Sequence, residues 1–237
     1  DGAVYVHQGE IFVVDEYDVD HGVALVHRDD PSYSTQARSV TEVQIVETLR
    51  SEKWGPATLC FGSVEVHSQV VSYLKRSSQT HGVIGEELLD LPERTLPTQA
   101  VWWTVEASAV AAVLDDTDVP GAAHAAEHAS IGLLPLLATC DRWDIGGLST
   151  ALHPDTGLLT VFVHDGHPGG AGFAERGHAV AARWLRMTRD AIADCPCRDG
   201  CPACVVSPKC GNGNDPLDKA GAVRLLDVVL RHAPDPS

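Results

Sequence analysis

Ten residues near the end of the chain, Cys195-Pro-Cys-Arg-Asp-Gly-Cys-Pro-Ala-Cys204, constrain its fold more than any other stretch. Together with Cys210 they contain five of the seven cysteines. Four thiolates can converge on one Zn²⁺ ion in a tetrahedral site with Zn–S distances of about 2.3 Å. The second cysteine pair has the C-x-x-C spacing of a zinc knuckle, and proline restrains the tighter C-x-C pair. We therefore predict a structural zinc site formed by Cys195, Cys197, Cys201 and Cys204, with Cys210 as a possible substitute.

Two other chemistries of clustered cysteines are disfavoured. Disulfides need an oxidising compartment, and residues 1–8 lack the basic and apolar regions of a secretory signal peptide. Thioredoxin-like redox chemistry needs a strand before the C-x-x-C motif, whereas a long helical pattern precedes Cys195. A structural zinc stays the favoured interpretation.

Length and composition indicate a globular chain. Its 237 residues, 44% of them apolar, suffice for one large domain or two modest ones. No run of 18 apolar residues predicts a membrane span, so we expect a cytoplasmic protein with no membrane partner. Because the chain starts without Met, directly in a strand-like pattern, we also expect a fragment of a longer protein.

The net charge of −16 argues against a surface that attracts nucleic acid everywhere. Residues 1–50 contain ten acidic residues and three arginines. Residues 176–210 contain six basic residues and three acidic ones. Any contact with phosphates should therefore be local.

The N-terminal third predicts short strands. Turn-forming residues separate runs rich in β-branched residues at 11–14, 23–26, 43–46 and 64–66. With a further run that starts at Val4, about five such strands favour a small barrel-like module. With a boundary after Ser78, we predict an α+β chain composed of a β-rich accessory module at 1–78 and an α+β zinc-binding domain at 79–237.

Within the second part the pattern changes between strands and helices. We expect a buried strand at 100–105, a short helix at 107–114, a buried helix over 124–140 that Pro135 interrupts, and a hairpin at 148–163. A further helix should cover 173–194. A last helix should begin with Asp215 as N-cap, Pro216 at the first position and Asp218 at the third.

The glycine-rich loop at 165–173 lies before a predicted helix. Its glycines do not match the dinucleotide-binding fingerprint. Backbone N–H groups at the start of a helix could hold an anion such as a DNA phosphate. We favour the alternative that the glycines allow close packing against the hairpin.

His124, Glu127 and His128 match H-x-x-E-H, in which two histidines bind a catalytic zinc and the glutamate activates water. Such a peptidase also needs a distant third ligand, and short patterns arise easily in a chain with 12 histidines. We favour solvent-facing histidines and keep a zinc peptidase as a minor alternative. Walker, G-x-S-x-G and kinase motifs are absent from the sequence, so we assign no catalytic residue.

Three stretches carry a resemblance to a known family: Cys140–Gly147, Asp165–Gly177 and Cys195–Lys219. The last one, with Gly-Cys-Pro-x-Cys-Val-x-Ser-Pro-Lys-Cys-Gly-Asn, is long and specific. The opening Gly2–Glu10 also matches. The chain resembles the C-terminal region of Mrf-A-like bacterial superfamily 2 DEAD/DEAH-box DNA helicases over nearly its whole length.

This resemblance implies a four-cysteine metal-binding region that follows two RecA-like motor lobes absent from this sequence. The family's motors are ATP-dependent, use Mg²⁺, move 3′ to 5′ on single-stranded DNA and serve DNA repair. The metal ligands of the family correspond to Cys195, Cys197, Cys201 and Cys204.

We thus expect a non-catalytic accessory region that guides or clamps single-stranded DNA for motor lobes in cis. Arg183, Arg186 and Lys209 are the predicted DNA contacts because they stand near the cysteine stretch in the sequence. The alternative is a zinc-stabilised interaction module that docks a DNA-repair protein.

Overall fold

The computed structural model describes residues 1–235, and they form two compact units. Unit 1 consists of Asp1–Thr41 and Ser68–Arg94, and unit 2 consists of Glu42–His67 and the chain from Thr95 onward. Strands β4 (Tyr33–Trp54) and β5 (Ala57–Ser77) contribute residues to both units. The division therefore differs from the predicted boundary after residue 78, because each of these two long strands crosses from one unit into the other.

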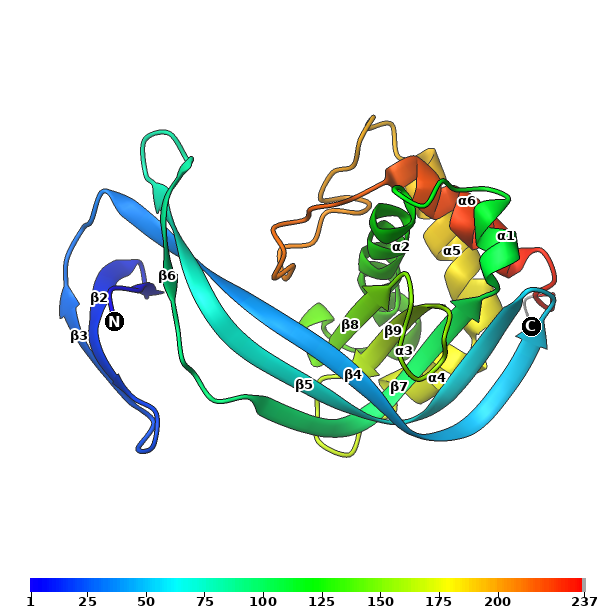
Figure 1. Ribbon diagram of the computed structural model, residues 1–237, viewed down its shortest axis with the longest axis horizontal. Coiled ribbons are helices and arrows are strands. Elements are labelled where there is room, and N and C mark those ends of the chain that lie inside the picture. The colour runs from blue at the N-terminus through cyan, green and yellow to red at the C-terminus, as the bar shows by residue number, and fades with distance from the viewer. Residues whose placement is uncertain (236–237) are drawn as a thin grey trace. The chain divides into compact units, whose positions relative to one another are not determined.

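Unit 1 is built from antiparallel strands (Figure 1). Strands β1 (Val4–His7), β2 (Glu10–Asp18) and β3 (Val23–Arg28) form a sheet in that order, and β6 (Val83–Leu88) pairs with the end of β5. The start of the chain is fixed by the Tyr73 hydroxyl, which donates to the Asp1 carbonyl at 2.8 Å. Among the described residues this is an open sheet and not the predicted barrel-like closure.

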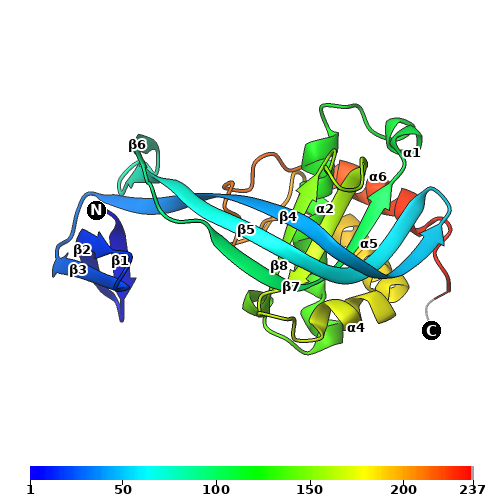
Figure 2. The same ribbon diagram turned by 60° about the horizontal axis from the view of Figure 1, so that its bottom comes forward.

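Unit 2 contains the rest of a larger sheet with the order β4-β5-β7-β9-β8. Strands β7 (Arg94–Val105), β9 (Leu159–Asp165) and β8 (Ile145–Thr150) are antiparallel neighbours. The helices of this unit lie beside the sheet (Figure 2). They are α1 (Ala107–Ala111), α2 (Val119–Leu133), α3 (Pro135–Ala138), α4 (Phe173–Ala179), α5 (Ala181–Asp194) and α6 (Lys219–Leu230), with a 3₁₀ turn, η1, at Arg142–Asp144.

The apolar residues of β7 are buried on both faces of the sheet. On one face Val101 and Trp103 belong to the main core, which α2, α5 and α6 complete. On the other face Ala100 and Trp102 belong to a smaller core with residues of β4, β5 and β9. A continuous apolar run is what a strand buried on both sides requires, so the expected strand at 100–105 and the α+β class are confirmed.

Helix boundaries follow the sequence at Pro135 and depart from it elsewhere. Helix α1 ends at Ala111 and not at 114, and α2 begins at Val119 and not at 124. Pro135 ends α2 and begins α3, as expected. The expected helix at 173–194 is two helices, because Val180 leaves helical geometry at φ −116°. The last helix begins later than expected, since its N-cap is Asp218, whose carboxylate accepts the Gly221 N–H at 2.8 Å. Across residues 1–235 we find no helix with both the length and the apolar character to cross a membrane.

Candidate metal centre

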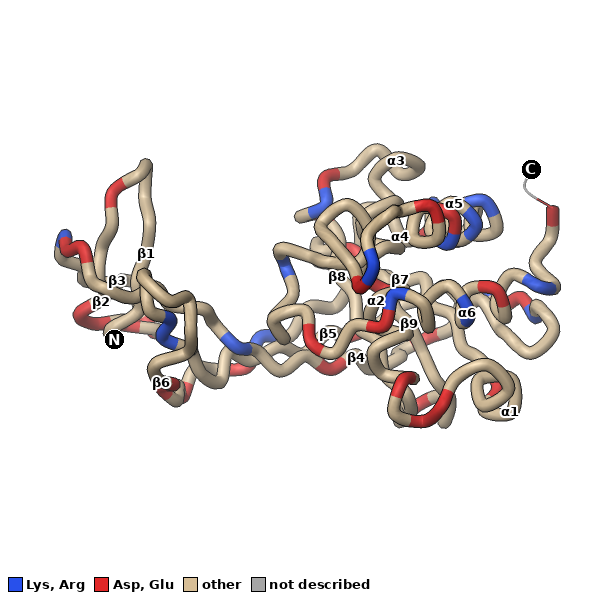
Figure 3. The backbone as a smooth tube through the Cα atoms, turned by 90° about the horizontal axis from the view of Figure 1, so that it is seen from above, with Lys and Arg blue, Asp and Glu red and all other residues tan. Residues whose placement is uncertain are grey.

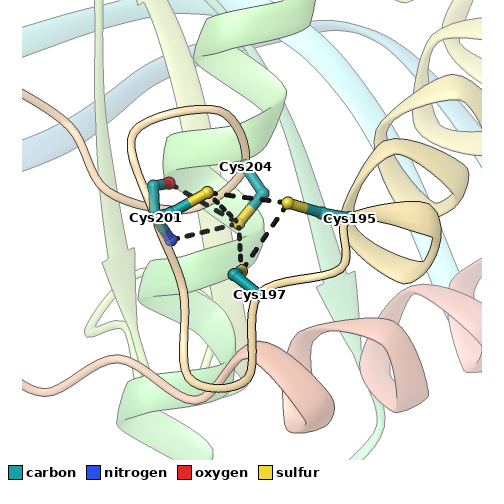
Figure 4. A group of neighbouring side chains, drawn as sticks. All are labelled: Cys195, Cys197, Cys201 and Cys204. Carbon is teal, nitrogen blue, oxygen red and sulfur yellow. Dashed lines mark hydrogen bonds between the residues drawn. The ribbon is translucent and has the colours of Figure 1, made fainter.

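The four predicted cysteines converge after the end of α5 (Figure 4). Neighbouring Sγ atoms lie 3.5–3.8 Å apart in the four pairs Cys195/Cys201, Cys197/Cys204, Cys195/Cys197 and Cys201/Cys204. Tetrahedral Zn–S bonds of about 2.3 Å place their sulfurs about 3.8 Å apart. All seven cysteines are free thiols, so no disulfide competes for these sulfurs. The group fits Zn²⁺ in donor type, number and spacing.

Local backbone geometry brings the second pair into position. Gly200 has φ +122°, and a Cβ atom there would lie 2.6 Å from Val205. The Cys201 carbonyl accepts the N–H groups of Cys204 and Val206 at 3.0 and 3.1 Å, which closes the knuckle turn. The Cys201 N–H also points to the Cys204 sulfur at 3.3 Å. The glycine before the C-x-x-C motif is therefore required by both conformation and space.

A lysine at the start of α6 holds the first pair. The Lys219 ammonium donates to the carbonyls of Cys195 and Cys197, both at 2.6 Å. It ties the last helix to the cysteine loop through the backbone of two sulfur-bearing residues. The sequence gives no sign of this contact, because its acceptors are main-chain atoms.

The crowded thiols influence each other's ionisation. Burial raises the pKa of Cys204 to about 12. At Cys197 burial acts in the same direction, but hydrogen bonds with the other thiols outweigh it and lower its pKa to about 7. Four thiolates at these distances need a cation among them, which the Zn²⁺ ion would supply.

Cys210 lies outside this group, against helix α2. Its Sγ is 3.4 Å from Nε2 of His124, and His128 completes a second cluster of three possible metal ligands. The expectation that the two histidines face solvent is wrong for His128, which is only 4% exposed. The loop that carries Cys210 covers this end of the helix, and the sequence pattern of α2 alone could not show that.

Glu127 has a different neighbour. Its carboxylate is buried and accepts the Ser149 hydroxyl at 2.7 Å. Burial raises its pKa. The third member of the H-x-x-E-H pattern thus points to a strand residue of β8, and it is not among the three clustered ligand atoms.

The glycine-rich loop before α4 surrounds the side chain of Asp165. The Asp165 carboxylate is fully buried and accepts the N–H groups of Ala171, Gly172, Phe173 and Ala174 at 2.5–3.3 Å. These are the amides that could have held a phosphate. The loop's own carboxylate uses them, so they fix the strand β9 to the start of the helix.

The three residues predicted to contact DNA differ in how far their side chains are already bonded to the protein. Arg183 is exposed on α5, whereas Arg186 donates to the carbonyls of Ala233 and Pro234. The Lys209 ammonium is half-buried and donates to the carbonyls of Arg142 and Ile145 at 2.9 and 2.7 Å. Burial lowers the pKa of Lys209.

A family model and several relatives identify this arrangement. Residues 126–205, which include all four clustered cysteines, match the family described as the MrfA Zn-binding domain. The chain belongs to this family. Over 112 residues it is 38% identical to an uncharacterized protein of Methanocaldococcus jannaschii, and the match covers 45% of this chain and 98% of that protein.

Longer relatives are ATP-dependent helicases. The chain is 29% identical over 86% of its length to the helicase YprA of Bacillus subtilis, and 28% identical over 97% of its length to the helicase hrq1 of Schizosaccharomyces pombe. It spans 27% and 23% of their lengths and corresponds to their C-terminal region.

The fold itself is also shared with a helicase. A crystal structure of the DUF1998 helicase MrfA bound to DNA matches 96% of this chain, with a TM-score of 0.68 and 27% identity, and the match covers 30% of that helicase. A second structure, bound to DNA and AMPPNP, matches with a TM-score of 0.55 and 28% identity over 96% of this chain and 27% of that one. The predicted resemblance is confirmed.

Proposed function

We propose that this chain is the non-catalytic accessory region of an ATP-dependent 3′–5′ DNA helicase. The helicase is cytoplasmic and acts in DNA repair. The accessory region guides or clamps single-stranded DNA for motor lobes in cis, which bind ATP and Mg²⁺. The observation that carries the proposal is the match of nearly the whole chain to part of a helicase bound to DNA. Cys195, Cys197, Cys201 and Cys204 hold a structural Zn²⁺ in this proposal.

The zinc acts through the elements next to it. When bound, it supplies a fixed tetrahedral crosslink between the end of α5 and the knuckle turn. Lys219 extends that crosslink to α6 by its two bonds to the cysteine carbonyls. The ion therefore keeps the surface of α5 at a defined position.

Helix α5 is the proposed DNA contact. Basic positions gather on it (Figure 3), and they are Arg183, Arg186 and Arg189. Arg189 is engaged with Asp227 and Asp190, so Arg183 is the residue most available to a phosphate. Lys209 and Arg186 contribute to the same proposal, mainly by holding loops through their carbonyl contacts.

The test is salt-dependent binding of single-stranded DNA by the full-length helicase. Arg183→Ala should weaken binding and reduce the slope of log K against log salt by about 0.7, the value for one phosphate contact on a single strand. The triple change of Arg183, Arg186 and Lys209 to Ala should weaken binding further, because it also releases the loops that Arg186 and Lys209 hold. Arg231→Ala, at an exposed position after α6, is the matched control. An unchanged affinity and slope in the triple variant would contradict the DNA assignment.

One observation bears on the interaction-module alternative, and it concerns unit 1. Strand β3 is exposed throughout, and its apolar residues include Val23, Leu25 and Val26. Such patches mark contacts with other proteins or domains. Loss of binding to a repair protein, with DNA affinity intact, after substitution in β3 would support that alternative over docking to the motor.

A further inference from the structure

Three potential ligand atoms meet at a second place, between helix α2 and the loop after the knuckle. His124 and His128 are one helical turn apart on α2, and their ring centroids are 4.2 Å apart. One ligand atom from each of them and the Cys210 sulfur all lie within 4.8 Å of one another. None of these residues belongs to the four-cysteine group.

Hydrogen bonds fix the orientation of both imidazoles. Nδ1 of His124 lies 2.9 Å from the Pro216 carbonyl, and Nδ1 of His128 lies 2.8 Å from the Val205 carbonyl. Since a carbonyl only accepts, both Nδ1 atoms carry the proton and, in the neutral rings, both Nε2 atoms carry a lone pair. Histidines that ligate metals are held by backbone carbonyls in this way.

The sulfur of Cys210 is the third ligand atom, and a backbone amide fixes its position. Cys210 Sγ accepts the Asn214 N–H at 3.2 Å. Three lone-pair atoms this close together, the Cys210 sulfur and one nitrogen of each imidazole, repel one another unless a proton or a cation lies among them. A single proton can satisfy one such contact, whereas a metal ion satisfies all three.

The distance between His124 Nε2 and Cys210 Sγ agrees with Zn²⁺. Tetrahedral bonds of about 2.0 Å to nitrogen and 2.3 Å to sulfur place the two atoms about 3.5 Å apart. The observed separation of His124 Nε2 and Cys210 Sγ is 3.4 Å. Imidazole and thiolate donors together suit zinc.

We propose that His124, His128 and Cys210 form a second Zn²⁺ site. Three protein ligands leave one coordination position for water or another ligand. The ion ties α2 to the loop at 205–216, whose carbonyls at Val205 and Pro216 orient the two histidines. The site lies next to the first one in sequence, since Val205 directly follows Cys204.

Zinc stoichiometry tests the proposal on the full 237-residue chain. Protein equilibrated with a buffered low concentration of free Zn²⁺ and then gel-filtered should contain two zinc ions per chain by elemental analysis. Cys210→Ser and His124→Gln should each contain one, because the four-cysteine group is untouched. Cys140→Ser, at a half-buried thiol outside both clusters, should retain two.

Cobalt substitution gives a second readout that does not depend on stoichiometry alone. Thiolate-to-Co²⁺ absorption should fall by about one fifth in Cys210→Ser, as one of five thiolate ligands is lost. Circular dichroism identifies a variant that does not fold. In that case the zinc content of the wild-type chain, two ions or one, decides whether the second site exists. One zinc per wild-type chain, or two in a folded Cys210→Ser variant, overturns the proposal. So does rapid alkylation of Cys210 in zinc-loaded protein, which would indicate a free thiolate–imidazolium pair.

Discussion

Lys219 shows how a single side chain joins two elements without touching a sulfur atom. Its ammonium lies 2.6 Å from each of two carbonyl oxygens in the cysteine loop. A hydrogen bond from a charged donor is worth about 1.5–3 kcal/mol, and a buried carbonyl left unpaired is costly. The residue therefore stabilises the loop by fixing its backbone.

Lys219→Met should lower the free energy of unfolding by about 2–3 kcal/mol, since both carbonyls lose their partner. It should also weaken zinc binding, measured by competition with a chromogenic chelator. Urea denaturation of the zinc-loaded chain measures the first effect. Lys53→Met, which removes an exposed ion pair with Glu106, is the control and should change stability far less. Equal effects of the two substitutions would show that the Lys219 contacts add nothing.

The sequence predicts the structural roles of some residues and not those of others. The spacing of Cys195, Cys197, Cys201 and Cys204 predicts their convergence, because thiolate side chains this close in the sequence can reach one metal ion. The roles of Lys219 and Asp165 could not be predicted, because both side chains bond to main-chain groups. Main-chain groups are the same at every position and leave no pattern.

For helices and strands, the sequence predicts the element but not which of its side chains a distant segment buries. The apolar sequence of α2 predicts a central helix, and its interruption at Pro135 follows from the missing N–H. The burial of His128 depends on a loop 77 residues further along, whose Val205 carbonyl it contacts. Likewise the break between α4 and α5 occurs at Val180, and residues 178–182 contain neither proline nor glycine.

Zinc removal should loosen a defined set of elements. Structural zinc sites contribute roughly 10 kcal/mol or more to folding in small thiolate domains. Chelation should speed amide hydrogen exchange in the knuckle at 201–206 and at the start of α6, which Lys219 connects to the cysteine loop. Strands β7 and β9, paired over six residues each in the main core, should keep their protection.

Exchange measured by mass spectrometry before and after chelation gives the comparison. Added Zn²⁺ should restore the original rates, which controls for irreversible damage. Uniform acceleration across β7 and β9 as well would mean that the metal supports the whole of unit 2. No acceleration at 201–206 would contradict a structural role for the ion.

For the whole molecule, the sequence predicts the α+β class, with a strand-rich first part followed by a part in which strands and helices alternate. The division into units could not be predicted from it, because β4 and β5 each contribute residues to both units. Long strands that belong to two units carry no boundary signal of their own. The exposed apolar residues of unit 1 are a further property that becomes visible only when the strands are placed.

Strand β3 provides the prediction that concerns the whole protein. Among residues 1–235 it is an edge strand that pairs with β2 alone, and its adjacent residues Leu25 and Val26 are 55% and 41% exposed. Successive residues of a strand point to opposite faces, so both faces of β3 are uncovered in this chain. An apolar edge strand in this state is prone to associate with other chains. In the full-length helicase we therefore expect the motor lobes to cover it.

Hydrogen exchange in β3 should be at least tenfold slower in the full-length helicase than in the isolated chain. Leu25→Asp should remove most of that difference and increase exchange in the full-length protein, because a carboxylate cannot be buried there without a partner. Glu16→Gln, at an exposed position of the neighbouring strand, is the control and should leave it unchanged. Equal exchange in the isolated chain and the full-length protein would show that β3 does not dock on the motor, and its apolar face would then be available to a separate partner.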